Sequence, residues 1–202
     1  RKVPVSQATM VARPDDAAAH PHRPSLLGVG TIIWLGSEFM FFSSLFAAYF
    51  TLRAHAATTW PPPPVKLDVL QSGIATIILV LSSFTCQIAL FRLEKGRRSS
   101  TRKWLVLTIV MGAIFLSNQA YEWATLNFST SSNAYGSMFY LMTGIHGLHV
   151  LLGLVAMVGL MGRMVGPNGD PGEVPAFQGI SYYWHFVDVV WVALYSALFL
   201  LH

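Results

Sequence analysis

Residues 177 to 201 read FQGISYYWHFVDVVWVALYSALFLL, an apolar run that is long enough to cross a lipid bilayer as a helix. A transmembrane helix needs about 20 predominantly apolar residues, because each residue adds about 1.5 Å along the axis. The run nevertheless contains two ionisable residues, His185 and Asp188, three positions apart. A metal or haem site, a proton relay and a structural polar pair are three explanations for such residues inside a membrane.

The rest of the chain contains four further apolar runs of this length. Only 11% of the 202 residues are charged and 53% are hydrophobic, with a mean hydropathy of +0.51, whereas about a quarter of a soluble domain is charged. Ten-residue segments of alternating hydrophobicity, which are typical of β-barrels, are absent. The sequence therefore predicts an all-α membrane protein with one bundle of five transmembrane helices, at about residues 28–52, 68–91, 104–126, 137–161 and 177–201.

The bundle is expected to occupy residues 26–202, after a flexible cytoplasmic tail at residues 1–25 that is rich in Pro, Ala, His and Arg. Cys86 is the single cysteine, so an intrachain disulfide and an all-cysteine metal site are both excluded.

The positions of the basic residues predict the orientation, because cytoplasmic loops carry an excess of Lys and Arg. With alternating sides, 11 of the 13 basic residues fall on the side of the N-terminus, and only Arg53 and Lys66 fall on the other side. We therefore expect a cytoplasmic N-terminus and a C-terminus outside. The net charge is +4, but the basic residues lie in the segments that flank the apolar runs and do not form one basic face. No nucleic-acid partner is therefore expected.

The segment RLEKGRRSSTRK, residues 92 to 103, holds the densest positive charge. The charge either serves only to set the topology or also binds anionic lipid at the inner leaflet. The basic residues of this loop are Arg92, Lys95, Arg97, Arg98, Arg102 and Lys103.

Ionisable side chains inside the predicted spans need a partner or a function, because burying a charge at mid-membrane costs about 2.5 to 3.5 kcal/mol on insertion scales. Helical rise places Glu38, His149 and Asp188 within about 5 Å of one layer near mid-membrane. The simplest arrangement is a polar layer in which the first, fourth and fifth spans meet around Glu38. The candidate residues of this intramembrane polar network are Glu38, Gln119, Glu122, His146, His149, His185 and Asp188.

The depths of the histidines favour a structural pair over a metal or haem site at His185 and Asp188. His185 lies about one turn inward of the layer and His146 about one turn outward, so His185 is not level with a histidine of the fourth span. A direct proton-transfer role for the pair stays open. Glu38 has no counter-ion nearby in sequence, so it is either a hydrogen-bonded core carboxyl or a proton- or lipid-linked site.

Glycines in the fourth span predict close helix packing, since small residues let transmembrane helices approach one another. They are Gly144, Gly147 and Gly153. The sequence contains no nucleotide-binding glycine loop, nucleophile elbow or zinc-protease motif.

Five segments taken together resemble subunit III of the haem-copper oxidases, specifically of cytochrome c oxidase. The segments are WLGSEFMFFSSLFAAYF, WPPPPVKLDVLQSGIATIILVLSSFTCQIA, GAIFLSNQAYEW, AYGSMFYLMTGIHGLHVLLG and YYWHFVDVVWVALY. The resemblance covers nearly everything from about residue 28 to 202. The chain has only five helices where the mitochondrial type has seven, and in this it resembles bacterial forms.

The resemblance implies an accessory subunit without a cofactor or catalytic centre of its own, in the bacterial plasma membrane. Its partners would be subunit I and subunit II, which hold the haems and copper, together with small subunits, phospholipid that includes anionic lipid and, in a supercomplex, a cytochrome bc complex. The whole enzyme would reduce oxygen to water and pump protons. Subunit III would support proton uptake and protect against turnover inactivation.

The resemblance also assigns individual residues. Glu38 matches the family's carbodiimide-reactive glutamate, and the pairs at His146 and His149, at His185 and Asp188, and at Gln119 and Glu122 match polar positions of its helices. Two alternatives remain: subunit III of a quinol-oxidising haem-copper oxidase, and a self-contained haem-binding or transport protein.

Overall fold

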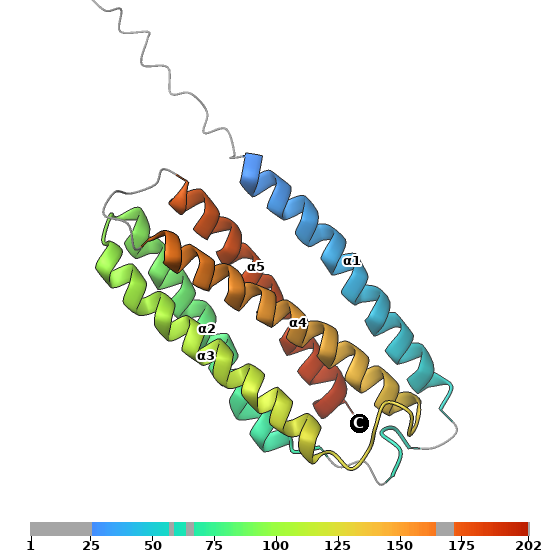
Figure 1. Cartoon of the computed structure of the whole chain (residues 1–202). Helices are drawn as coiled ribbons and strands as arrows, with labels where there is room; N and C mark the ends of the chain where they lie inside the picture. Colours follow the sequence, from blue (N-terminus) through green and yellow to red (C-terminus); the bar gives the residue numbers. More distant parts are fainter. Residues whose placement is uncertain (1–25, 57–58, 64–66, 165–171, 202) are drawn as a thin grey trace, which may run out of the picture.

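A computed structural model describes residues 26–56, 59–63, 67–164 and 172–201 of the chain. Within these ranges the chain forms long helices and no strand (Figure 1). The expected tail at residues 1–25 lies outside the described residues.

In the part of the chain that the structure describes, five helices make up the bundle, and each of them is long and apolar enough to span a membrane. The all-α, five-span prediction is therefore confirmed. The helices are α1 (Leu26–Ala54), α2 (Val69–Glu94), α3 (Arg98–Thr125), α4 (Ala134–Arg163) and α5 (Glu173–Tyr195), and a π-helical turn η2 (Ser196–Leu200) continues α5.

The helices extend past the apolar runs at several ends. The third span was expected from about residue 104, whereas α3 begins at Arg98. Charged side chains at a helix end reach the aqueous interface, so the helix continues where the hydrophobic signal has stopped. Hydropathy therefore marks the membrane core and not the helix boundary.

Local hydrogen bonds fix the helix ends. Asp68 accepts from the backbone N of Gln71 at 2.9 Å at the start of α2, and Asn133 caps α4 in the same way. The turn from α2 into α3 places Gly96 at a φ of 69°, a conformation that glycine adopts without strain. Its backbone N–H donates to the carbonyl of Leu93, and the next N–H donates to the carbonyl of Arg92, which is the Schellman pattern.

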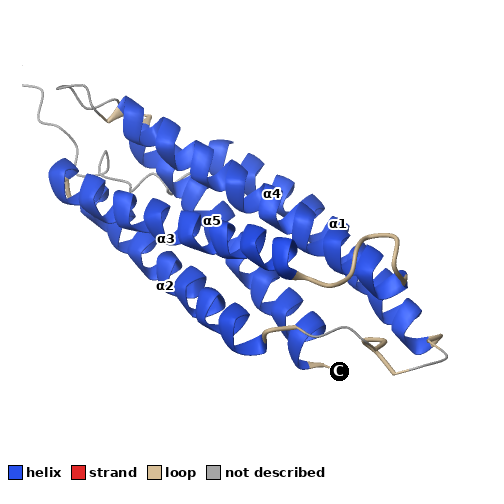
Figure 2. Ribbon diagram, turned by 60° about the horizontal axis from the view of Figure 1, so that its bottom comes forward, coloured by secondary structure: helices blue, strands red, loops and turns tan. Residues whose placement is uncertain are grey.

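Helix α5 lies at the centre of the bundle, where it packs against α1, α2 and α4 (Figures 1 and 2). Helix α3 packs against α2 and α4. Trp184 of α5 is fully buried between two glycines. A Cβ added to Gly112 would lie 2.9 Å from the Trp184 ring, and a Cβ added to Gly153 would lie 2.8 Å from it. The space that Gly153 leaves open is therefore filled by the indole of Trp184.

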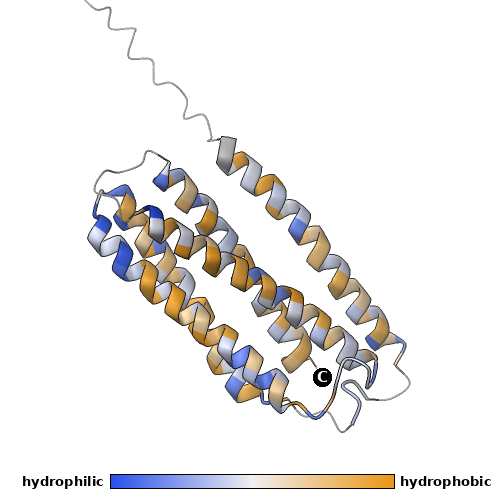
Figure 3. Cartoon of the chain, viewed as in Figure 1, coloured by the Kyte–Doolittle hydropathy of each residue, from blue (hydrophilic) through white to orange (hydrophobic). Residues whose placement is uncertain are grey.

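Helix α1 is bound to the bundle far more loosely than α5. Only 6% of its most apolar window is buried, against 56% for α5. Apolar residues predominate along the helices and hydrophilic residues lie mostly towards the helix ends (Figure 3). Many large apolar side chains are exposed on the bundle. Such a surface is suited to lipid or to other membrane-embedded subunits.

Candidate functional site

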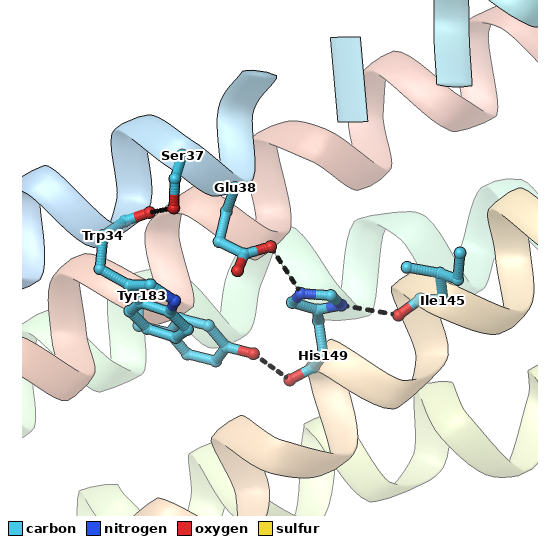
Figure 4. Close-up of polar contacts among 6 residues, drawn as sticks. All are labelled: Trp34, Ser37, Glu38, Ile145, His149 and Tyr183. Atoms are coloured by element: carbon cyan, nitrogen blue, oxygen red, sulfur yellow. Dashed lines mark hydrogen bonds and ion pairs between the residues drawn. The ribbon is translucent and has the colours of Figure 1, made fainter. Parts of the chain in front are cut away.

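Glu38 of α1 and His149 of α4 form a polar pair in the middle of the membrane-spanning region (Figure 4). The carboxylate oxygen Oε2 of Glu38 lies 3.2 Å from Nε2 of His149, and both side chains are largely buried. Glu38 and His149 were expected to lie at the same depth in the membrane, and in the structure they are in direct contact.

The second ring nitrogen of His149 determines how many protons the pair holds. Nδ1 lies 2.8 Å from the backbone carbonyl of Ile145. A carbonyl oxygen only accepts, so Nδ1 carries a hydrogen and donates it. The bond between Nε2 and Glu38 then contains one proton, which is either on the carboxyl or on the imidazole. The pair is neutral overall in both cases, which limits the cost of placing it in the membrane.

Aromatic side chains hold the pair in place. The Tyr183 hydroxyl donates to the backbone carbonyl of His149 at 2.8 Å, and the Tyr183 ring stacks on Trp34 with 5.2 Å between centroids (Figure 4). Phe42 contacts the His149 ring edge-on at 5.1 Å. These contacts join α1, α4 and α5 around the carboxyl.

An apolar hollow of about 330 Å³ lies next to the pair, since Trp34 and Tyr183 belong to its wall. It runs between α1, α4 and α5. Its lining consists of Thr31, Trp34, Leu152, Ala156, Ala176, Gly179, Ile180 and Tyr183.

His185 and Asp188 do not lie against the helices that bear Glu38 and His149, and this expectation is corrected. His185 Nε2 lies 3.1 Å from Oε1 of Gln87, and the Ser83 hydroxyl donates to Oδ2 of Asp188. Residues three apart share one face of a helix, and this face of α5 is turned towards α2. The two side chains fasten α5 to α2 instead of binding each other.

The two histidines of α4 have different surroundings. His146 is 0% exposed, and neither ring nitrogen has a hydrogen-bond partner among the described residues. Its ring stacks on Trp191 at 4.8 Å and meets Phe115 edge-on at 6.0 Å. His146 therefore faces α3 and α5, whereas His149 faces α1.

Gln119 and Glu122 lie on the buried side of α3. Glu122 accepts a hydrogen bond of 3.0 Å from the Ser72 hydroxyl of α2, and Nε2 of Gln119 has no partner among the described residues. The predicted single layer is therefore replaced by separate groups at the α1–α4, α2–α5 and α2–α3 contacts. In the described part of the chain, no three His, Cys, Asp or Glu side chains gather within reach of one metal ion.

Sequence reasoning missed the polar residues of α2 that pair with the other helices. Trp184 Nε1 donates to the Ser82 hydroxyl and Trp191 Nε1 donates to the Thr76 hydroxyl, each at 2.9 Å. The signal that could have found them is a set of hydroxyl and amide residues in α2, in which Ser72 and Thr76 are four positions apart, as are Ser83 and Gln87.

The basic loop surrounds the turn between α2 and α3. Arg97, Arg98 and Lys103 contribute to a surface hollow of about 640 Å³ at this end of the bundle. Arg98 also forms an ion pair with the buried Glu173 at the start of α5. Part of the loop's charge therefore fastens helices together.

Comparisons with known proteins agree over nearly the whole chain. The family model for cytochrome c oxidase subunit III matches residues 20–201. A probable cytochrome c oxidase subunit 3 of Mycobacterium tuberculosis strain H37Rv is 47% identical over 181 residues, which is 88% of this chain and 89% of that protein. The corresponding protein of Corynebacterium diphtheriae is 41% identical over 194 residues, 94% of each chain, and that of Thermostichus vulcanus is 37% identical over 188 residues, 91% of this chain and 90% of that protein. The chain therefore belongs to the cytochrome c oxidase subunit III family.

Proposed function

We propose that this chain is a cofactor-free accessory subunit of a proton-pumping cytochrome c oxidase. It packs on catalytic subunit I, and the haems and copper that reduce oxygen belong to subunits I and II. Its contribution is to sustain proton uptake and to protect the enzyme against inactivation during turnover. The observation that carries the proposal is the contact of 3.2 Å between Oε2 of Glu38 and Nε2 of His149, two largely buried side chains on different helices.

The pair has the properties of a group linked to proton movement. A lone carboxylate in hydrocarbon is costly, and an imidazole partner lets the carboxyl release its proton without creating an isolated charge. The backbone bond to Ile145 orients the His149 ring so that Nε2 faces the carboxyl. Glu38 is the proton-linked group in this proposal, and His149 positions it.

Phospholipid is the second part of the proposal. The hollow beside Trp34 and Tyr183 is apolar and runs towards the N-terminal ends of α1 and α5, where Thr31 and Ala176 line it. This shape suits an acyl chain whose headgroup lies at the surface. The basic residues of the α2–α3 turn lie at the same end of the bundle, and they supply charge for anionic headgroups.

The same end is proposed to face the cytoplasm of a bacterial cell, with the C-terminus of the chain outside the plasma membrane. Small oxidase subunits and a cytochrome bc complex in a supercomplex are the further partners of the proposal.

Replacing Glu38 by Gln tests the proposal in the intact oxidase complex. Glutamine keeps the size of the side chain and removes the exchangeable proton, so we expect normal assembly and a faster loss of oxygen consumption over successive turnovers. Glu94→Gln, at the end of α2, is the control, and its activity should decay as in the wild type. Normal turnover and normal inactivation kinetics in Glu38→Gln would make Glu38 structural only.

The subunits that co-purify with the chain test the assignment to a cytochrome c oxidase. A copper-bearing subunit II is expected. A complex that contains the chain but lacks this copper centre and oxidises quinol would overturn the choice of electron donor.

A further inference from the structure

A second hollow, with four polar side chains among its lining residues, lies on the other side of α5, away from the Glu38 pair. It has a volume of about 440 Å³ and lies between α2 and α5, with Ser83, Gln87, His185 and Asp188 among its lining residues. Phe84 and Val189 also line it and are 63% and 69% exposed, so the hollow opens at the outer surface of the bundle.

Asp188 has one buried carboxylate oxygen beside this hollow that lacks a hydrogen-bond partner among the described residues. Its side chain belongs to a residue that is only 5% exposed, and Ser83 donates to Oδ2, whereas Oδ1 has no partner among the described residues. The oxygen of Gln87 already accepts from His185 at 3.1 Å and from Ser181 at 3.3 Å. An unsatisfied polar group near the middle of a membrane helix costs several kcal/mol, so a partner from outside the chain is favoured.

A third hollow flanks the same surface. It has a volume of about 320 Å³ and lies between α1 and α5, with Ser43, Ala193 and Val189 in its lining. Val189 lines both hollows and therefore forms a ridge between them. Small side chains beside the ridge, such as Ser43, Ala193 and Ser83, allow another helix to approach closely.

We propose that this α1–α5–α2 surface is the docking site for a transmembrane helix of another oxidase subunit, which donates a hydrogen bond to Asp188 from a hydroxyl, amide or indole group. The second carboxyl torsion of aspartate is broad, so a small rotation presents Oδ1 to the hollow. The proposal rests on the accessory-subunit function and adds the surface and the chemistry of the partner.

The depth of Asp188 favours a helix over a phospholipid. Asp188 lies 15 residues after Glu173 and 12 before Leu200, about halfway along the span formed by α5 and η2. A phospholipid headgroup lies at the membrane surface and its acyl chains carry no hydrogen-bond donor. A side chain on a membrane-spanning helix reaches this depth with a donor.

Photo-cross-linking in the whole oxidase tests the surface. A photoreactive amino acid is placed at Val189 or Phe84, and at Val155 of α4, which is 61% exposed and lines none of the hollows described above. We expect adducts with another oxidase subunit from probes at Val189 and Phe84, and far fewer such adducts from the probe at Val155. Lipid adducts alone, or no adducts, at Val189 and Phe84 would overturn the proposal, as would equal cross-linking from Val155.

A second pair of variants tests the hydrogen bond. Asp188→Asn keeps an accepting oxygen and should be retained in the purified complex, whereas Asp188→Leu should be lost from it more readily in detergent. Equal retention of the two variants would contradict the role of Asp188. If the wild-type chain co-purifies but cross-links only through α4, the surface is wrong and the accessory function stands. If the wild-type chain does not co-purify with an oxidase, both proposals fail.

Discussion

His149 on α4 and Glu38 on α1 share one hydrogen bond of 3.2 Å, although 111 positions separate them in the chain. Because the other ring nitrogen of His149 donates to a backbone carbonyl, this bond contains a single proton. Removing the imidazole should therefore change the chemistry of the carboxyl and not only its packing.

The first prediction concerns the reactivity of Glu38 towards a hydrophobic carbodiimide. His149→Phe removes the group that competes for the carboxyl proton, so modification of Glu38 should become faster than in the wild type. Mass spectrometry of the peptide that contains Glu38 measures the modification, and Glu38→Gln provides the blank. Slower labelling in His149→Phe would contradict the shared-proton arrangement.

The second prediction concerns the contact between Gly153 and Trp184. A methyl group at Gly153 would lie 2.8 Å from the buried indole, so Gly153→Ala should destabilise the bundle by about 1 to 3 kcal/mol. Gly159→Ala, on the same helix, meets nothing within 4 Å and should be neutral or slightly stabilising. Thermal unfolding in detergent compares the two. Equal midpoints would show that the indole moves aside freely.

The third prediction is an energetic coupling between Ser72 and Glu122. Ser72→Ala removes the hydroxyl that donates to this buried carboxyl at 3.0 Å. A double-mutant cycle with Glu122→Leu should give a coupling of about 0.5 to 2 kcal/mol in the free energy of unfolding. Additive single effects would mean that the hydrogen bond contributes nothing to stability.

The fourth prediction concerns the ion pair between Arg98 and Glu173. Glu173 is only 3% exposed, so Arg98→Ala leaves a buried carboxylate without its partner and should cost about 3 to 5 kcal/mol. The exposed Arg102 offers a control, since Arg102→Ala should change the unfolding midpoint little. Adding Glu173→Leu to Arg98→Ala should restore most of the stability, and failure to do so would contradict the ion-pair explanation.

The fifth prediction separates an accessory subunit from a self-contained haem protein. The chain purified alone should show no Soret band in its visible spectrum. A Soret band that disappears in His149→Ala or in His185→Ala would overturn the accessory assignment.

The sequence predicted the helices well because a membrane span is specified by a local property. Each apolar run is long enough by itself, and helical rise gives the depth of a residue such as Glu38 or His149 directly. Reasoning from helical rise could therefore predict that Glu38 and His149 lie at the same depth.

The hydrogen-bond partners of His185 and Asp188 could not be predicted from the sequence. Depth fixes a position along the helix axis, whereas the neighbouring helix depends on how each helix is rotated and on which helices are adjacent. The hydroxyl and amide residues of α2 indicate that this helix has a polar face, but they do not tell which helix packs on that face, so Ser83 and Gln87 could not be assigned as the partners on α5. The same reason explains why His146 and His149 face different helices.

The distance in sequence between Glu38 and His149 has a consequence for biosynthesis. Helix α1 leaves the ribosome before α4, and its carboxyl cannot meet the imidazole until 111 further residues have been made. At about 5 to 20 residues per second this interval lasts roughly 6 to 22 s. During that time the nascent helix has neither its polar partner nor its neighbours α4 and α5. During this interval the Glu38 carboxyl needs another way to avoid an unpaired charge in lipid, such as the insertion machinery, a chaperone or protonation. The final placement of α1 in the membrane therefore depends on α4.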